Sequence, residues 1–150
     1  MKKSYMINIM VVFSFSIAGI IIAKGSPLIF WDFPSFIFTP LFAIILILGH
    51  YTPGEIIDAF KSAGKESRSE VELKRALLFF NTFHKLVIIS GIFAFMLGNV
   101  LIISLSPSEE FNRIFGKFMA ISFLTIVYAL FIVLTITVPF QSALKKKLIK

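Results

Sequence analysis

Apolar and charged positions divide the chain into four long uncharged stretches separated by polar segments. These stretches cover residues 4–23, 33–54, 86–108 and 118–144. A helix needs about 20 apolar residues to cross the hydrocarbon core, and the backbone in lipid must satisfy its own hydrogen bonds. The pattern predicts an all-α integral membrane protein with one membrane domain, 1–150, and four transmembrane helices at about 5–23, 34–51, 84–105 and 113–140.

The polar segments carry signals for helix starts and stops. Residues 24–27, Lys-Gly-Ser-Pro, predict the end of the first helix. Thr52 and Glu55 form a capping box around Pro53, which predicts a short amphipathic helix on the membrane surface within the helical cytoplasmic loop 52–83. Ser67 with Glu70, and Ser106 with Glu109, have the same spacing. They predict the starts of two long helices. We expect these helices to contain the third and fourth spans and to extend beyond the membrane into the cytoplasm.

The distribution of positive charge predicts the orientation. The start of the chain, the loop 52–83 with Lys85, and the tail hold 12 of the 15 Lys and Arg residues. Loops rich in Lys and Arg stay on the cytoplasmic side. We therefore expect a protein of the inner (cytoplasmic) membrane with both termini in the cytoplasm. The net charge of +7 then suits anionic lipid head groups rather than nucleic acid.

The first span admits a second interpretation, as a cleaved signal peptide. Its apolar run is long for such a segment and lacks a clean small-x-small site before Lys24. An uncleaved first span is the favoured interpretation. Cleavage would not change the orientation of the other three spans.

Composition excludes most enzyme chemistry. The chain has no cysteine, and its two histidines, His50 and His84, belong to different segments. The Ser, His and acidic residues match no nucleophile motif, and no Gly-rich loop resembles a phosphate cradle. We expect no enzyme activity, no metal and no cofactor.

Small and polar residues mark one face of each of the last two spans. Ser90, Gly91, Ala94 and Gly98 in the third span have the spacing of a close helix contact. In the fourth span, Ser122, Thr125 and Ala129 share a face, and Tyr128 lies beside them. On spacing alone, these residues either pack helices together or line a channel.

Several segments together resemble the MotA/TolQ/ExbB proton-channel family, closest to the flagellar stator A subunit. Residues 32–35, Asp-Phe-Pro-Ser, resemble the family's D-x-P-S before its second span, and residues 55–63, EIIDAFKSA, resemble its surface helix. The run 116–144 is similar to the family's fourth span, with matches at Met119, Ala120, Leu124, Thr125, Tyr128 and Pro139.

The resemblance implies a homo-oligomer, a pentamer, around a single-span MotB/ExbD-like partner that supplies the proton-carrying Asp. Thr125 would then line a channel and Pro139 would bend a helix. Uncharged spans agree with a borrowed carboxylate, because ion pathways normally need an ionisable group within the membrane. The sequence thus favours a scaffold subunit of a complex driven by the proton-motive force. The alternative is a non-conducting accessory or assembly protein.

Overall fold

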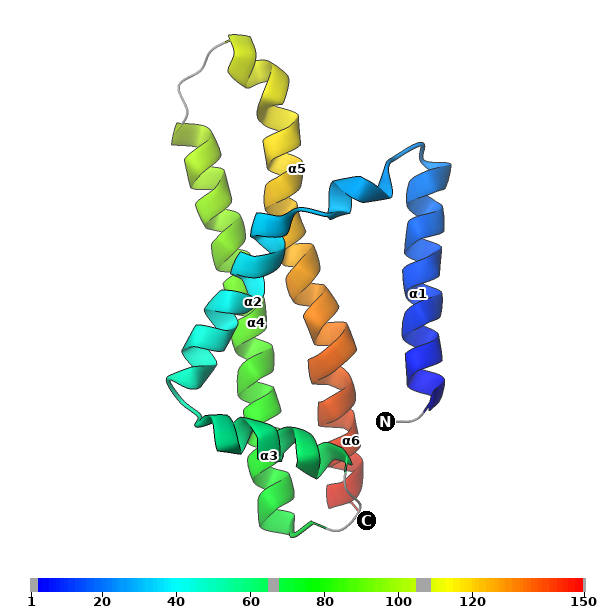
Figure 1. Cartoon of the computed structure of the whole chain (residues 1–150), viewed down its shortest axis with the longest axis vertical. Coiled ribbons are helices and arrows are strands. Elements are labelled where there is room, and N and C mark those ends of the chain that lie inside the picture. Colours follow the sequence, from blue (N-terminus) through cyan, green and yellow to red (C-terminus); the bar gives the residue numbers. More distant parts are fainter. Residues whose placement is uncertain (1–2, 65–67, 105–108, 150) are drawn as a thin grey trace.

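The computed structural model describes residues 3–64, 68–104 and 109–149, and this part of the chain is almost entirely helical. Its helices are α1 (Lys3–Ile22), α2 (Phe33–Leu48), α3 (Pro53–Gly64), α4 (Glu70–Ser104), α5 (Glu109–Ile132) and α6 (Val138–Leu148). A 3-10 helix (Pro27–Phe30) precedes α2, and a π-helical segment (Val133–Thr137) joins α5 to α6 (Figure 1).

Three helices have the length and hydropathy to cross a membrane: Tyr5–Ile22, Glu70–Ser104 and Phe115–Leu148. A fourth crossing results if α2 and α3, which meet at an angle of 106°, count as one bent span. The expected all-α membrane protein is therefore confirmed with three or four spans. The predicted second span, 34–51, is shorter in the structure. Its 16 residues reach about 24 Å, against a hydrocarbon core of about 30 Å.

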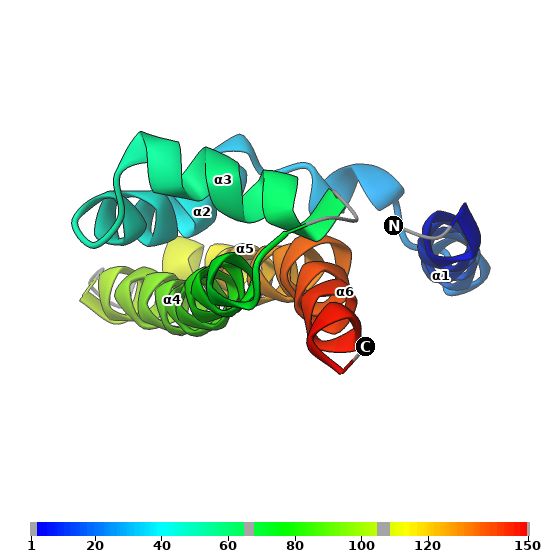
Figure 2. The ribbon, with the colours of Figure 1, turned by 90° about the horizontal axis from the view of Figure 1, so that it is seen from below.

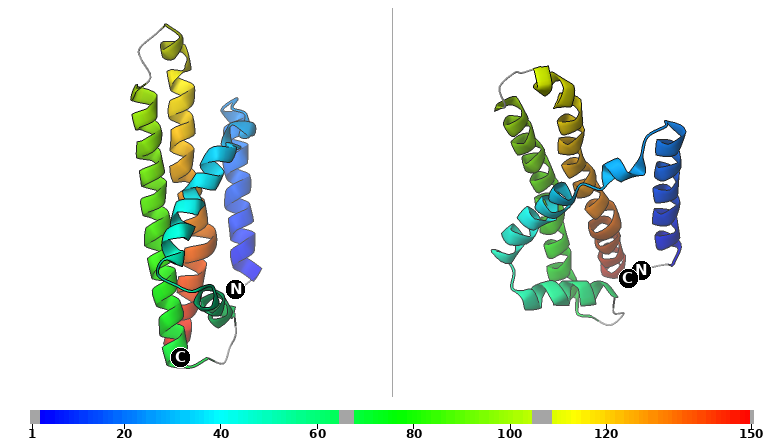
Figure 3. Two further views of the ribbon diagram at one scale, coloured as in Figure 1. Left: turned by 60° about the vertical axis from the view of Figure 1, so that its left-hand side comes forward. Right: turned by 45° about the horizontal axis from the view of Figure 1, so that its top comes forward.

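The helices form two layers beside one separate helix. Figure 2 shows α2 and α3 on one face of a layer made by α4, α5 and α6. The two views in Figure 3 show α4 running alongside α5 and α6 as an antiparallel hairpin. Helix α1 stands to one side of both layers, with none of its apolar window buried. It touches them where the Tyr5 hydroxyl donates to the Leu134 carbonyl and where the Phe13 ring lies 6.0 Å from that of Phe131.

The long rod predicted for the third span is present as α4. It has 35 residues and a length of about 52 Å. Ser69 and Glu72 form a capping box at its start, and Ser67 of the predicted box with Glu70 lies outside the described residues. The Ser69 N–H donates to Glu72 Oε2 at 2.9 Å, and the Glu72 N–H donates to Ser69 Oγ at 3.3 Å. Both pairs have the same spacing, so the pattern alone favoured neither. The box predicted at Ser106 lies outside the described residues.

The short helix predicted after Thr52 is present as α3, and its place on the membrane surface stays a prediction. The Thr52 N–H donates to Glu55 Oε2 at 2.8 Å, and the Glu55 N–H donates to Thr52 Oγ1 at 3.3 Å. These hydrogen bonds from Thr52 lower the pKa of the Glu55 carboxyl. At its other end, Lys147 Nζ donates to the carbonyls of Ser62 and Ala63 at 3.0 and 2.9 Å. A cation at a helix C-terminus also complements the helix dipole.

A hydrophobic core lies between α3, the first half of α4, and α6. Phe79, Phe80 and Leu144 are buried there, and Phe60 and Phe140 contribute ring contacts at centroid distances of 5.0 to 6.1 Å. Such aromatic pairs stabilise beyond the area they bury. The core fixes α3 at one end of the α4–α6 hairpin, where α6 also ends (Figure 1).

The first helix ends as its Lys-Gly-Ser-Pro sequence predicted. Lys24 has a φ of 57°, and the N–H groups of Lys24 and Gly25 donate to the carbonyls of Ile21 and Ile20. This is the hydrogen-bond pattern of a Schellman cap. The chain then crosses to the bundle through the 3-10 helix, so α1 is joined to the rest at its C-terminal end.

Candidate functional site

The two predicted faces of the last spans meet in a very close contact between α4 and α5. A Cβ added to Gly91 would lie 2.5 Å from Ala129 Cβ, and one added to Gly98 would lie 3.1 Å from Ser122 Cβ. Ser90 and Ala94 are buried on the same side of α4. Small residues at these positions allow the two backbones to approach.

Thr125 is the centre of the polar contacts in this region. It is 6% exposed, and its Oγ1 donates to the carbonyls of Gly91 and Ser122 at 3.2 and 2.8 Å. The Thr125 carbonyl also accepts from Oγ1 of Thr39 on α2, at 3.4 Å. One residue of α5 thereby contacts both α4 and α2. Thr39 lies in the second uncharged stretch, and no spacing rule links it to Thr125.

A second polar contact lies nearer the C-terminal end of α4. Asn99 Nδ2 donates to the Phe95 carbonyl at 2.8 Å and to Ser122 Oγ at 3.4 Å. Ser122 Oγ in turn donates to the Met119 carbonyl at 2.8 Å. Asn99 was not among the predicted residues, although a polar amide inside an apolar span is itself a signal of interhelical hydrogen bonding.

Tyr128 lies at the edge of this contact and connects α5 to the start of α2. Its hydroxyl donates to the Phe30 carbonyl and accepts from the Asp32 N–H at 3.2 Å. Its ring packs edge-on against Phe36, at a centroid distance of 5.5 Å. Asp32 caps α2 by accepting from the Ser35 N–H at 2.9 Å.

The structure thus brings the candidate channel residues together with the candidate packing residues. Ser122, Thr125 and Ala129 are all buried between helices of the same chain. Within the described part of one chain they face neighbouring helices rather than an open passage. Their role as a channel lining stays a prediction that concerns the assembled complex.

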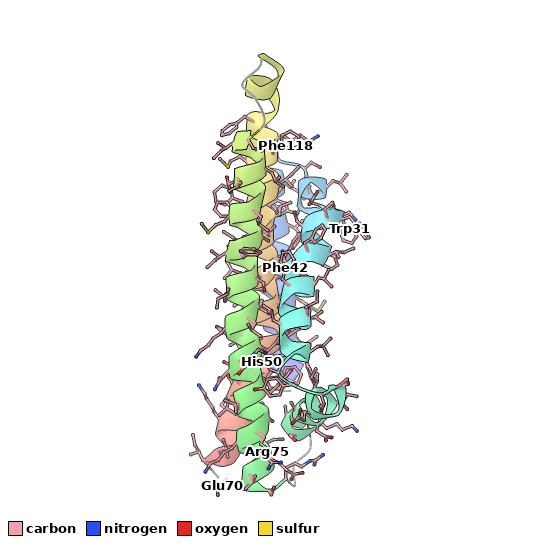
Figure 4. The ribbon with its side chains drawn as sticks, turned by 90° about the vertical axis from the view of Figure 1, so that its left-hand side faces the viewer. Trp31, Phe42, His50, Glu70, Arg75 and Phe118 are labelled. Atoms are coloured by element: carbon pink, nitrogen blue, oxygen red, sulfur yellow. The ribbon has the colours of Figure 1, made fainter. Side chains whose placement is uncertain are left out.

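Ser90 differs from the other hydroxyls at this depth. It is 2% exposed, and its Oγ has no hydrogen-bond partner among the described residues. It lies in the wall of an apolar hollow of about 240 Å³ between α2 and α4. The hollow is lined by Phe42, Ile45, Leu46, Ile89, Ser90 and Phe93. Phe42 is seen between the two helices in Figure 4.

Pro139 is the second residue after the π-helical segment. Proline has no N–H to donate to the preceding turn. The wider turn accommodates it, and the Val138 N–H donates to the Val133 carbonyl. Thr137 is fully buried there, and its Oγ1 lies 2.8 Å from Nδ1 of His84. The sequence singled out Pro139 as a bend but did not indicate a π-helix.

The remaining titratable groups lie apart from this site. His50 Nδ1 is 2.8 Å from the Leu46 carbonyl at the exposed end of α2. Glu70 pairs with Lys74 and Glu72 pairs with Arg68, both at i, i+4 spacing. Over the described ranges, no three or more His, Asp or Glu side chains gather as metal ligands would.

No protein-family model matches the chain, and no curated protein matches it. The described residues form a helical membrane protein with a small, hydroxyl-rich contact at the centre of the α4–α5 hairpin.

Proposed function

We propose that the chain is a scaffold subunit of a membrane complex driven by the proton-motive force. In this proposal the α4–α5 hairpin borders an ion path, and the titrating carboxylate comes from a single-span MotB/ExbD-like partner. The chain is then a multi-pass protein of the inner membrane with both termini in the cytoplasm. Several copies surround the partner, and the resemblance implies five.

One observation carries the proposal: the hydroxyls in the middle of the α4–α5 hairpin. Thr125, Ser122 and Ser90 are buried there. The stretches 86–108 and 118–144, which form most of the hairpin, contain no Asp, Glu, Lys or Arg. Polar groups within a membrane are expensive and usually serve packing or transport. A path bordered by hydroxyls still needs a group that binds and releases protons, and in this proposal the partner provides it.

The order of the helices gives further support. A span, a capped second helix, a surface helix and a long hairpin follow one another, in the order that the resembling segments suggested. The Asp32 cap and the surface helix α3 fall on the residues that carry the resemblance.

A second candidate function, a non-conducting assembly protein, is favoured by a different observation. The same Thr125, Ser122 and Ala129 are enclosed within a single chain. In that case the hydroxyls only hold α2, α4 and α5 together.

Proton flux into liposomes that contain a pH-sensitive dye distinguishes the two functions. The partner is the product of a neighbouring reading frame. It has one apolar span, with an Asp just inside that span. We expect no flux from the purified chain alone and a clear flux after co-reconstitution with that partner. Flux from the chain alone would contradict the proposal. A partner that binds but yields no flux would support the assembly role.

Thr125→Val tests the hydroxyl at nearly constant volume, with Thr125→Ser as its matched control. If the hydroxyl borders the path, Thr125→Val should remove most of the flux while the complex still assembles, and Thr125→Ser should retain it. The hydrogen bond itself contributes about 0.6 kcal/mol on average in membrane proteins, with a maximum of about 1.7. We therefore expect the Thr125→Val chain to remain folded. Normal flux from that variant would remove Thr125 from the path.

A further inference from the structure

We propose that the Tyr5 hydroxyl of α1 caps the backbone carbonyl that the bend at Pro139 leaves open, and that α1 is thereby coupled to the bend between α5 and α6. The hydrogen bond then stabilises the wide turn of the π-helical segment. The inference goes beyond the proposed function and requires neither an ion path nor a single-span partner.

The first observation concerns the Leu134 carbonyl in the π-helical segment. In an α-helix this oxygen accepts from the N–H group four residues later, and in a π-helix from the one five residues later. The fourth residue is Val138, whose N–H donates to the Val133 carbonyl. The fifth residue is Pro139, which has no N–H. Leu134 is therefore the residue whose carbonyl the wide turn and the proline leave open.

An open carbonyl is unfavourable at this place in the chain. Leu134 belongs to the fourth uncharged stretch and is 54% exposed. Acyl chains have no donor, so a backbone group freed by proline in a membrane is paired by a neighbouring helix, a Ser or Thr side chain or water. The hydroxyls next to it are engaged elsewhere. Thr135 Oγ1 donates to the Phe131 carbonyl at 2.7 Å, and Thr137 Oγ1 donates to the Val133 carbonyl at 3.2 Å.

Tyr5 supplies the donor from a neighbouring helix. Its hydroxyl donates to the Leu134 carbonyl, although the two residues are 129 positions apart in the sequence. Figure 1 shows the N-terminal end of α1 on the side of α6, where this hydrogen bond forms. Further along α1, the Phe13 ring packs against that of Phe131, which precedes Leu134 on the antiparallel helix. Since none of the apolar window of α1 is buried, the Tyr5 hydrogen bond is a main attachment of this helix.

This hydrogen bond couples α1 to the bend in both directions. A shift of the π-helical segment that moves the Leu134 carbonyl away removes an attachment of α1, and a displacement of α1 leaves the carbonyl open again. Such coupling is reciprocal, because the same contact stabilises both elements. Tyr5 stands at the start of a span in the sequence, and no local pattern links it to Pro139.

Carbonyl NMR of the full chain in detergent micelles observes the hydrogen bond directly. A leucine is followed by a threonine at two places, 124–125 and 134–135. A chain labelled with ¹³C-carbonyl leucine and ¹⁵N-threonine therefore gives two carbonyl–amide peaks. Thr125→Ser removes the first peak and so assigns the second to Leu134.

Tyr5→Phe removes the hydroxyl and keeps the ring. We expect the Leu134 carbonyl peak to move to lower frequency, because the carbonyl loses a hydrogen bond, and the Leu124 peak to stay. Tyr51→Phe is the matched control, since its hydroxyl lies against Thr82 in another part of the molecule, and it should move neither peak. An unmoved Leu134 peak in the Tyr5→Phe chain would overturn the cap. Movement of both peaks would show a general rearrangement and would also overturn it.

Pro139→Ala tests the link to the proline. Alanine restores an N–H five residues after Leu134, so the carbonyl no longer depends on Tyr5. We expect Tyr5→Phe to lower the thermal unfolding midpoint in the wild-type background and to lower it much less in the Pro139→Ala background. Equal losses in the two backgrounds would overturn the coupling. Neither measurement involves proton flux, so failure here leaves the proposed scaffold standing, and failure of the flux experiment leaves the cap standing.

Discussion

At the scale of single residues, a very close contact between α4 and α5 depends on the absence of a side chain. Gly91 faces Ala129 where even one methyl group would lie 2.5 Å away. Neither partner is a flexible side chain that can rotate out of the way. The spacing of small residues predicted a contact in this region. Only the packed structure pairs Gly91 with Ala129 and Gly98 with Ser122.

We expect Gly91→Ala to destabilise the hairpin by about 1–3 kcal/mol, the usual range for overpacking. The thermal unfolding midpoint in detergent measures the effect. Gly116→Ala is the control, because an added Cβ there has nothing within 4 Å. Adding Ala129→Gly to Gly91→Ala should restore most of the loss. If it does not, steric contact between these two residues is not the cause.

At the scale of helices, the end of one element is stabilised by a residue far away in sequence. Lys147 on α6 donates to the last carbonyls of α3, 84 and 85 residues earlier. The sequence placed this lysine in a basic tail facing lipid head groups and gave no reason to distinguish it from Lys145 or Lys146. Its position becomes specific only when α6 packs beneath α3.

Lys147→Met should loosen the C-terminal turn of α3. The expected cost is about 1 kcal/mol, near the low end for hydrogen bonds to a charged group because the site is only half-buried. Hydrogen exchange of the amides in Pro53–Gly64 measures it. Lys146→Met removes the same charge from an exposed position and should leave that exchange unchanged. Equal effects from both variants would point to net charge rather than to the cap.

At the scale of the whole molecule, α3, α4 and α6 share one basic end. Helix α3, the start of α4 and the end of α6 lie together (Figure 1), and Lys61, Lys74, Lys145 and Lys146 are exposed there. The 3-10 helix and Trp31 lie towards the opposite side of the bundle. By the charge rule this basic end faces the cytoplasm.

Labelling of single cysteines in intact cells tests that orientation. Ser26 and Ser142 are both exposed, at opposite ends of the expected arrangement. A membrane-impermeant maleimide should label Ser26→Cys and should not reach Ser142→Cys until the cells are broken. The reverse pattern would place the termini outside. Labelling of both in intact cells would contradict two ends in one compartment.

The sequence by itself determined the helical membrane class, the short helix after Thr52 and the long rod before residue 105. These follow from local causes: uncharged runs that must hydrogen-bond internally in lipid, and caps formed by residues three apart. It also found the small-residue faces of the last two spans, because helical spacing fixes which residues share a side.

Tertiary structure decided what those faces contact. Thr125 donates to Gly91 and accepts from Thr39, His84 lies against Thr137, and Ser90 has no partner among the described residues. None of these pairs is encoded by local spacing, because each depends on how far one helix slides and rotates against another. In a chain with apolar residues on nearly every side, hydropathy does not specify that choice. Close packing and the hydrogen bonding of buried hydroxyls determine how the helices slide and rotate against one another.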